Sequence, residues 1–382
     1  SPDMASNGTI YLNTVFDTQN TTLLIDSIEV EPEYTQGREP LILIPGIMGS
    51  EFEVKETFDP EIDNCLPDGN DFAYNQDDLV WLFTDLINVG YKYKGCDGKF
   101  LDVLQLQSDG ETPLYTQVGL KGSLTDIPYN NDTIPLLLQQ GYTLDQDLFI
   151  LPYDWRQDIG ISLHTLSNKI DAVLATASAS QVNIMAHSMG GLVAREYIRR
   201  DDVAHKVDTL VTFGTPHVGS PKSLAMLMYP VCIKWKDFIC AVNGNEVNKL
   251  VKHFTSAYEL LPSQTYYDLY PNLYPFNDIR DIDNNNVTGK LNYDQTKTML
   301  ANLGKDTHLL NVAELVHGVL DASYTDTNGV DTYMIAGSGF DTIGQVMEYE
   351  SGNTGLIKLD AIAINGDDTV PIRSATLNQS EN

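Results

Sequence analysis

Positive charge is scarce in this chain. Its 382 residues include 23 lysines and arginines against 53 aspartates and glutamates, which gives a formal net charge of −30. A surface this acidic repels phosphate backbones, so we expect no nucleic-acid partner, and it also disfavours unaided docking to anionic membranes. The charge balance is compatible with an extracellular or salt-tolerant protein.

Long hydrophobic runs, cysteine and cofactor motifs are also rare or absent. No apolar run approaches 18 residues, so the sequence predicts no transmembrane segment. None of the four cysteines has C-x-x-C spacing, which gives little support to a zinc or redox centre. The acidic run at 278–286 lacks the glycine and the closing glutamate of an EF-hand loop and is more typical of a solvated loop. We therefore expect no metal and no cofactor.

The cysteines instead form two local pairs, Cys65 with Cys96 and Cys232 with Cys240. This even, paired spacing predicts two disulfides and an oxidising compartment, so we expect an extracellular or secreted protein. Four buried thiols are the alternative.

A content of 42% apolar residues supports a sizeable core. Short apolar runs alternate with segments of helical periodicity, and this pattern predicts an α/β fold with a mostly parallel central sheet covered by helices on both faces. The strand candidates are 41–44, 148–151, 181–185, 209–213 and 330–336. The alternation stops at 221–329, where we expect an inserted cap with helices near 246–259 and 295–318. The core would then comprise 1–220 and 330–382.

The sequence around Ser188 is the most informative part of the chain. A buried strand at 181–185 is followed by the turn Ala186-His187-Ser188-Met189-Gly190 and then by a helix to Arg200. A serine on a sharp strand-to-helix turn is the context of a hydrolase nucleophile, and it requires small residues two positions away on either side. The helix N-terminus favours negative charge there, and the Met189 N–H is placed to donate to an oxyanion. A chance pentapeptide in a loop is the alternative.

A glycine-rich loop, Pro45-Gly46-Ile47-Met48-Gly49-Ser50, follows the strand at 41–44. Serine hydrolases of this type place their second oxyanion donor in such a loop, upstream of the nucleophile. An ordinary turn at the end of a strand is the alternative.

Residues 52–100 are irregular and contain Cys65 and Cys96. Between the cysteines, Leu79, Leu82, Phe83 and Leu86 form an apolar stripe of helical spacing, with Trp81 off the stripe. An exposed tryptophan on a disulfide-tethered segment suits an active-site lid or a lipid-contact surface. A core helix stapled by a disulfide is the alternative.

Taken together, six motifs resemble the lecithin:cholesterol acyltransferase-like family, which includes lysosomal phospholipase A2 and related bacterial lipases. They are 44–49, the 65–96 segment with Trp81, Pro152-Tyr153-Asp154-Trp155-Arg156, 186–191, Gly214-Thr215-Pro216 and Gly366-Asp367-Asp368-Thr369-Val370. The resemblance implies an α/β-hydrolase fold that cleaves lipid esters and, in some members, passes the acyl group to an alcohol.

The resemblance also implies site residues. Ser188 would be the nucleophile, Asp367 the triad acid, Ile47 and Met189 the oxyanion donors, and Trp81 a lid residue. Asp367 follows a late strand and respects the chain order Ser, Asp, His of this fold, although its neighbour Asp368 is an alternative.

The sequence departs from the family pattern at one point. The family's catalytic histidine follows the aspartate, but none of the seven histidines here follows Asp367. We expect the sequence to stop before the catalytic histidine; a histidine from the cap and a catalytically inactive relative are the alternatives. The leading interpretation is a lipid acyl hydrolase or acyltransferase without cofactor. A carboxylesterase on soluble esters and a binding domain built on an inactive hydrolase fold are the rivals.

The two disulfides are the first testable prediction. Peptide mapping under non-reducing conditions should find Cys65–Cys96 and Cys232–Cys240. If chain entropy dominates, each should stabilise the fold by about 2–4 kcal/mol, and the first, which closes the longer loop, should contribute more. Four free thiols in protein purified from an oxidising compartment would refute the pairing.

Overall fold

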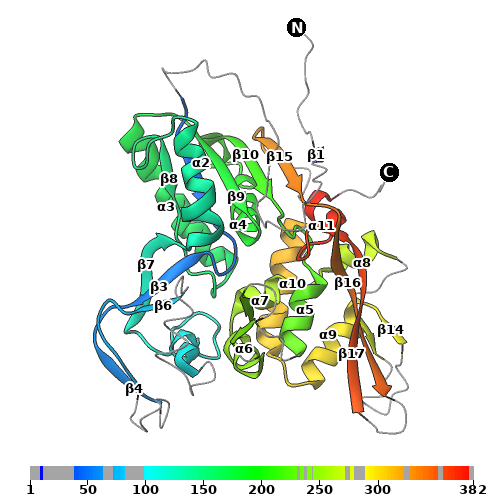
Figure 1. Ribbon diagram of the computed structural model, residues 1–382. Helices are drawn as coiled ribbons and strands as arrows, with labels where there is room; N and C mark the ends of the chain where they lie inside the picture. Colours follow the sequence, from blue (N-terminus) through cyan, green and yellow to red (C-terminus); the bar gives the residue numbers. More distant parts are fainter. Residues whose placement is uncertain are drawn as a thin grey trace.

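A computed structural model gives the architecture of most of the chain (Figure 1). It describes residues 9–11, 38–62, 72–81, 99–229, 233–235, 239–242, 244–271, 276–278, 289–321, 327–351 and 356–377. The first three cysteines, the side chain of Cys240 and most of the acidic run at 278–286 lie outside this description. No helix in these ranges is both long enough and apolar enough to cross a bilayer.

The centre of the molecule is a six-stranded sheet in which every described pairing is parallel. Its strand order is β1-β15-β10-β9-β2-β8. The strands are β1 Thr9–Tyr11, β2 Leu41–Ile44, β8 Leu148–Ile150, β9 Val182–His187, β10 Val207–Phe213 and β15 Asp331–Ala336. Because parallel strands end at the same edge, the residues that follow β2, β9, β10 and β15 lie close together at one edge.

Alternating residues of β2 show that both faces of this sheet are covered. Leu41 and Leu43 pack with Leu137 of helix α2 (Ile134–Gln139). Ile42 and Ile44 belong to the opposite cluster, which contains the apolar sides of α3 (Ile159–Ala177) and α4 (Met189–Ile198). All four residues of β2 are buried, as expected for a strand with helices on both faces. The predicted fold class is confirmed.

A layer of antiparallel strands follows β2 in the chain. One sheet has the order β6-β3-β7, and β4 pairs with β5 in a second. The strands are β3 Ser50–Val54, β4 Phe58–Ile62, β5 Phe72–Tyr74, β6 Leu79–Trp81 and β7 Val118–Leu124. The alternative of a core helix does not hold for 79–81, where pairing with β3 overrides the helical spacing. Residues 82–98 lie outside the described part of the chain.

The run Tyr153-Asp154-Trp155-Arg156 connects this layer to the central sheet. The side chains of Trp155 and Arg156 are almost completely buried. The Arg156 guanidinium donates to both carboxylate oxygens of Asp154 at 2.8 and 2.6 Å and lies 4.5 Å from the ring centre of Phe52 in β3. A buried guanidinium needs this pairing to offset its lost hydration.

The region 221–329 is largely helical in its described parts. The helices expected near 246–259 and 295–318 are present as the pairs α6–α7 and α9–α10. Its helices are α5 Pro221–Met228, α6 Gly244–Val251, α7 Thr255–Glu259, α8 Gln264–Leu269, α9 Tyr293–Asn302 and α10 Thr307–Leu320. A short hairpin pairs β11 (Ile233–Trp235) with β12 (Ile239–Val242).

A four-stranded sheet of order β14-β13-β16-β17 connects this region to the end of the chain. Its strands are β13 Phe276–Asp278, β14 Gly289–Leu291, β16 Phe340–Ser351 and β17 Leu356–Gly366. The cap boundary at 329 stays a prediction, since two of these strands precede it and two follow it. The long β16–β17 hairpin then returns the chain to the central sheet, where α11 (Ile372–Thr376) packs on β15 (Figure 1).

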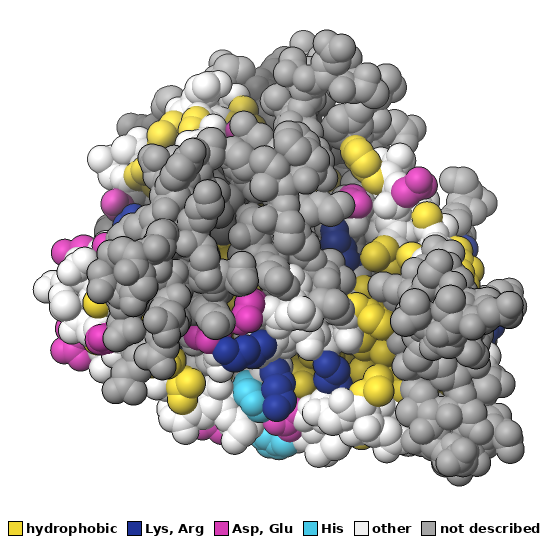
Figure 2. All heavy atoms as spheres, turned by 60° about the horizontal axis from the view of Figure 1, so that its bottom comes forward, with side chains coloured by type: hydrophobic (Ala, Val, Ile, Leu, Met, Phe, Trp, Pro, Cys, Tyr) yellow, Lys and Arg dark blue, Asp and Glu magenta, His cyan; other side chains and the backbone are white. Residues whose placement is uncertain are grey.

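One face of the molecule carries side chains of both charges. Figure 2 shows lysine, arginine and histidine side chains beside acidic ones on this face, with hydrophobic side chains next to them.

Candidate active site

Ser188 occupies a strained turn between β9 and α4. Its backbone has φ 52° and ψ −126°, a conformation that residues with a Cβ atom adopt at a cost of order 1–3 kcal/mol. The end of β10 stabilises the turn, since the Ser188 N–H donates to the Phe213 carbonyl at 2.8 Å. The residue as a whole is only partly buried.

Small residues around the turn are a steric requirement. A Cβ atom on Gly190 would lie 2.4 Å from the Pro45 carbonyl oxygen, and one on Gly191 would lie 2.0 Å from Thr215 Oγ1. A Cβ atom on Gly46 would lie 2.8 Å from the Ser188 Cβ atom. The glycine-rich loop thus lies directly against the candidate nucleophile.

Two backbone N–H groups near the serine turn have no hydrogen-bond acceptor among the described residues, those of Ile47 and Met189. The first lies in the loop that approaches Ser188 through Gly46, and the second is the first N–H of α4. Their role as oxyanion donors stays a prediction.

Asp367 lies at the same edge of the central sheet. Cβ atoms placed on Gly337 after β15 and on Gly214 after β10 would lie 2.7 Å from its Cβ and 2.8 Å from its Oδ2. Its Oδ1 accepts the N–H groups of Thr369 and Val370 at 2.9 and 2.7 Å. Burial raises the pKa of the Asp367 carboxyl, although these two hydrogen bonds act in the opposite sense.

Asp368, the alternative acid, has its side chain at the surface. Its side chain is 71% exposed and forms an ion pair with Lys222 at 3.2 Å. The geometry therefore favours Asp367 over Asp368 as the residue that faces the site.

No histidine of the described ranges forms a hydrogen bond with Asp367 or with the Ser188 hydroxyl. His217 is buried, with Nδ1 3.1 Å from an Arg195 nitrogen and Nε2 3.4 Å from Thr212 Oγ1. Burial, with the Arg195 charge second, lowers the pKa of His217 well below its ordinary value.

Two of the three histidines of the cap region lie on α10, and the third, His253, has its Nδ1 3.7 Å from Asp306 Oδ2. His317 contacts the Glu259 carbonyl at 2.7 Å and Asp321 at 3.1 Å. His308 is exposed, and its backbone N–H is capped by Asp306. The base of a triad therefore stays unassigned.

Trp81 is not exposed as the sequence suggested. Only 3% of the residue is accessible, its ring centre lies 5.5 Å from that of Trp155, and its Nε1–H donates to the Met48 carbonyl at 2.9 Å. The expectation of an exposed tryptophan is wrong because strand pairing turns this side chain into the layer below the loop. A role in a lid or in substrate contact remains a prediction.

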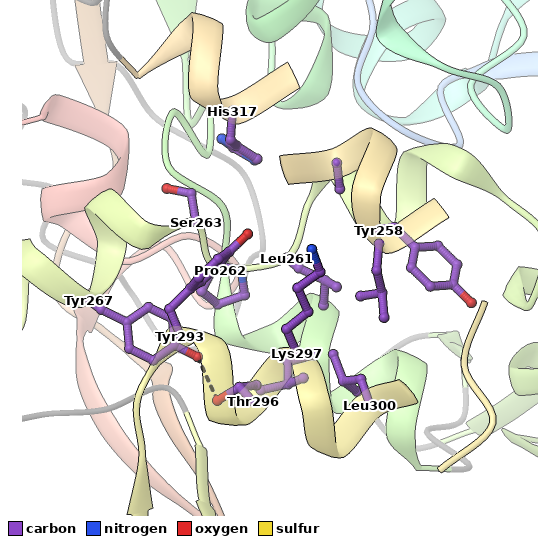
Figure 3. Close-up of a pocket in the computed structure, with 13 residues that line it drawn as sticks. Tyr258, Leu261, Pro262, Ser263, Tyr267, Tyr293, Thr296, Lys297, Leu300 and His317 are labelled. Carbon is purple, nitrogen blue, oxygen red and sulfur yellow. Dashed lines mark hydrogen bonds between the residues drawn. The ribbon is translucent and has the colours of Figure 1, made fainter. Parts of the chain in front are cut away.

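A separate pocket lies between α7, α8, α9 and α10 (Figure 3). Tyr267 and Thr296, which are joined by a hydrogen bond of 2.9 Å, are among the residues that line it, and His317 is another. None of the candidate catalytic residues lines this pocket, so it is distinct from the candidate catalytic centre at Ser188.

Comparison with known proteins shows which family the chain resembles. The family model described as "Lecithin:cholesterol acyltransferase" matches residues 120–309, which include Ser188 and Met189. Over this range the chain is similar to the lecithin:cholesterol acyltransferase family. The central sheet and the serine turn are accordingly those of an α/β-hydrolase fold. Ile47, Trp81 and Asp367 lie outside the matched range.

Individual relatives are distant. The chain is 25% identical over 215 residues to a phosphatidylcholine-sterol acyltransferase of Papio anubis, covering 51% of the chain and 47% of that protein. It is 24% identical over 225 residues to the human lysosomal phospholipase A and acyltransferase, covering 54% and 53%. It is 30% identical over 102 residues to phospholipase A(1) LCAT3 of Arabidopsis thaliana, covering 26% and 23%.

The chain spans about half the length of the first two of these curated relatives and about a quarter of the third.

Sequence reasoning missed one residue of the site. Tyr129 lies in a short helical segment, η2 (Asp126–Thr133), and its hydroxyl is 2.7 Å from both the Gly46 nitrogen and His187 Nδ1. No periodicity or motif marks it, and only the fold brings it beside the loop.

The strained turn generates the second prediction. Ser188→Gly should have an unfolding free energy about 1 kcal/mol higher than that of Ser188→Ala, because glycine accepts positive φ without strain. Urea titration of both variants measures the difference. Ser167, inside α3, provides the control, since there the glycine variant should be the less stable by about 1 kcal/mol. Equal stability of the two Ser188 variants would contradict the strain.

Proposed function

We propose that this chain is the catalytic part of a serine lipid acyl hydrolase or acyltransferase. The observation that carries the proposal is the strained Ser188 near two N–H groups, those of Ile47 and Met189, that have no acceptor in the described part of the chain. A nucleophile next to unpaired donors in a fixed backbone is the arrangement that acyl transfer needs.

The chemistry follows in two steps. The Ser188 hydroxyl oxygen attacks the ester carbonyl and passes its proton to a base, while the carbonyl oxygen becomes an oxyanion bound by the two N–H groups. The tetrahedral intermediate collapses, the alcohol leaves with that proton, and the acyl group stays on Ser188. Water or an acceptor alcohol then attacks the acyl-enzyme, which releases a fatty acid or a new ester.

Asp367 would orient the base in this scheme. Its Oδ1 is fully used by two backbone N–H groups, while its Oδ2 accepts no hydrogen bond from the described residues and faces Gly214 at the sheet edge. A histidine that donates to Oδ2 and accepts from the Ser188 hydroxyl completes the triad.

A lipid ester is the proposed substrate class because the three relatives named above are phospholipases or sterol acyltransferases by name. We place the enzyme outside the cell on the basis of its acidic charge and paired cysteines. The rival esterase would prefer water-soluble esters, and an inactive binding domain would cleave neither class.

Covalent labelling provides the third prediction. A fluorophosphonate probe should modify the full-length protein at Ser188, and Ser188→Ala should abolish the label. The protein should release fatty acid from phospholipid vesicles faster than it releases p-nitrophenol from an equal ester concentration of p-nitrophenyl acetate. Faster cleavage of the soluble ester would favour the esterase, and no label with no turnover would favour the binding domain.

The neighbouring aspartates provide the fourth prediction as a matched pair. Asp367→Asn should lower kcat of the full-length enzyme by about 10³–10⁴-fold, because an amide holds the histidine in the wrong tautomer. Asp368→Asn, which changes an exposed ion pair, should alter kcat less than about threefold. Steady-state kinetics of both variants on one ester substrate decide the assignment, and a larger loss for Asp368→Asn would reverse it.

A further inference from the structure

The loop at 45–50 is fixed by side chains from three other parts of the chain. Aromatic hydroxyl and indole groups donate to its backbone carbonyls at 2.9–3.0 Å. The bonds are Tyr153 OH to Pro45 O, Trp81 Nε1–H to Met48 O and Trp155 Nε1–H to Ser50 O. Three of the six carbonyls of this loop are thus held by surrounding rigid rings.

Tyr129 also contacts this loop, but as a hydrogen-bond acceptor and not as a donor. Its buried hydroxyl lies 2.7 Å from the Gly46 nitrogen, and because an N–H can only donate, the hydroxyl must accept there. The hydroxyl proton is then left for His187 Nδ1, also at 2.7 Å. Because the described residues offer this proton no other acceptor, we infer that His187 accepts at Nδ1 and carries its own proton on Nε2.

These contacts fix the peptide next to the free donor. The Pro45–Gly46 peptide is bonded at its carbonyl by Tyr153 and at its N–H by Tyr129. The following peptide is bonded at the Gly46 carbonyl by the Gly49 N–H at 3.1 Å. The Ile47 N–H is the group of these two peptides that has no partner among the described residues, and the fixed planes determine its direction.

We propose that Tyr129, oriented by His187, is a positioning residue that aims the Ile47 N–H at the carbonyl oxygen of the substrate. This rests on the proposed acyl-transfer function. Tyr129 touches neither Ser188 nor the reacting ester in this scheme; it acts by holding the Gly46 N–H.

Electrostatics keep the arrangement in one state at neutral pH. Desolvation lowers the pKa of the His187 imidazole to about 4, so the ring is neutral and its Nδ1 remains an acceptor. Burial raises the pKa of the Tyr129 phenol above its ordinary value, so the hydroxyl keeps the proton that it donates. The hydroxyl therefore continues to present a lone pair to the Gly46 N–H.

The fifth prediction tests Tyr129 by removing its hydroxyl. In Tyr129→Phe the Gly46 N–H loses its acceptor and the peptide is free to rotate, so kcat on a phospholipid or soluble ester should fall about 10–100-fold, less than the 10²–10³-fold loss of a direct oxyanion donor. KM should change less than about threefold, because ground-state contacts are untouched. Tyr197→Phe is the matched control, since this tyrosine of α4 is buried with an unpaired hydroxyl, and its kcat should be unchanged.

Variants of His187 test the same proposal independently, so the test does not require the Tyr129→Phe protein to fold. His187→Leu removes the acceptor of the Tyr129 proton and should lower kcat, whereas His187→Asn keeps an acceptor near the Nδ1 position and should retain more of it. The double variant Tyr129→Phe/His187→Leu should be no worse than the poorer single variant, because the two residues act as one unit.

Amide hydrogen exchange separates this inference from the proposed function. Exchange in the peptide that contains residues 45–50 should speed up in Tyr129→Phe and stay unchanged in Tyr197→Phe, whether or not the protein hydrolyses esters. Lack of labelling and turnover in the wild-type chain would defeat the proposed function, with the exchange result still deciding the role of Tyr129. Unchanged exchange in Tyr129→Phe, or an equal loss of kcat in the Tyr197→Phe control, would overturn the inference.

Discussion

The close approach of the Gly46 backbone to Ser188 is the constraint on which the site depends. A single Cβ atom on Gly46 would lie 2.8 Å from that of Ser188, so the loop after β2 and the turn after β9 can meet only without it. The adjacency of β2 and β9 in a parallel sheet brings both loops to one edge. The sheet order, the strained turn and the free N–H groups are consequences of the same packing.

Packing in the surrounding layer offsets the unfavourable free energy of the strained Ser188 backbone. The positive φ of Ser188 and the unpaired N–H groups are unfavourable by themselves, and they persist because their surroundings are over-determined. The surroundings are a layer of buried aromatic rings in which Trp155 contacts Phe52 and Trp81, with the paired guanidinium of Arg156 beside them. Those rings form the core of the antiparallel layer and also hold the loop, so stability and positioning come from the same side chains.

Much of the fold and part of the site could be predicted from the sequence. The runs of alternating strand and helix predicted the parallel sheet, and the serine turn was recognisable because its small residues follow from local geometry. The orientation of Trp81 was missed because a three-residue strand carries too little periodicity to outweigh a helical stripe. Tyr129 was missed because its partners, Gly46 and His187, are 83 and 58 residues away, and no local pattern encodes such a contact. The histidine of a triad is not among the described contacts of Asp367.

The most direct test of the central claim is the structure of the covalent adduct between Ser188 and a fluorophosphonate, since the phosphoryl oxygen occupies the position of the oxyanion. We expect that oxygen within about 2.7–3.1 Å of both the Ile47 and the Met189 nitrogens. An adduct on another residue, or a phosphoryl oxygen that contacts neither nitrogen, would contradict the account.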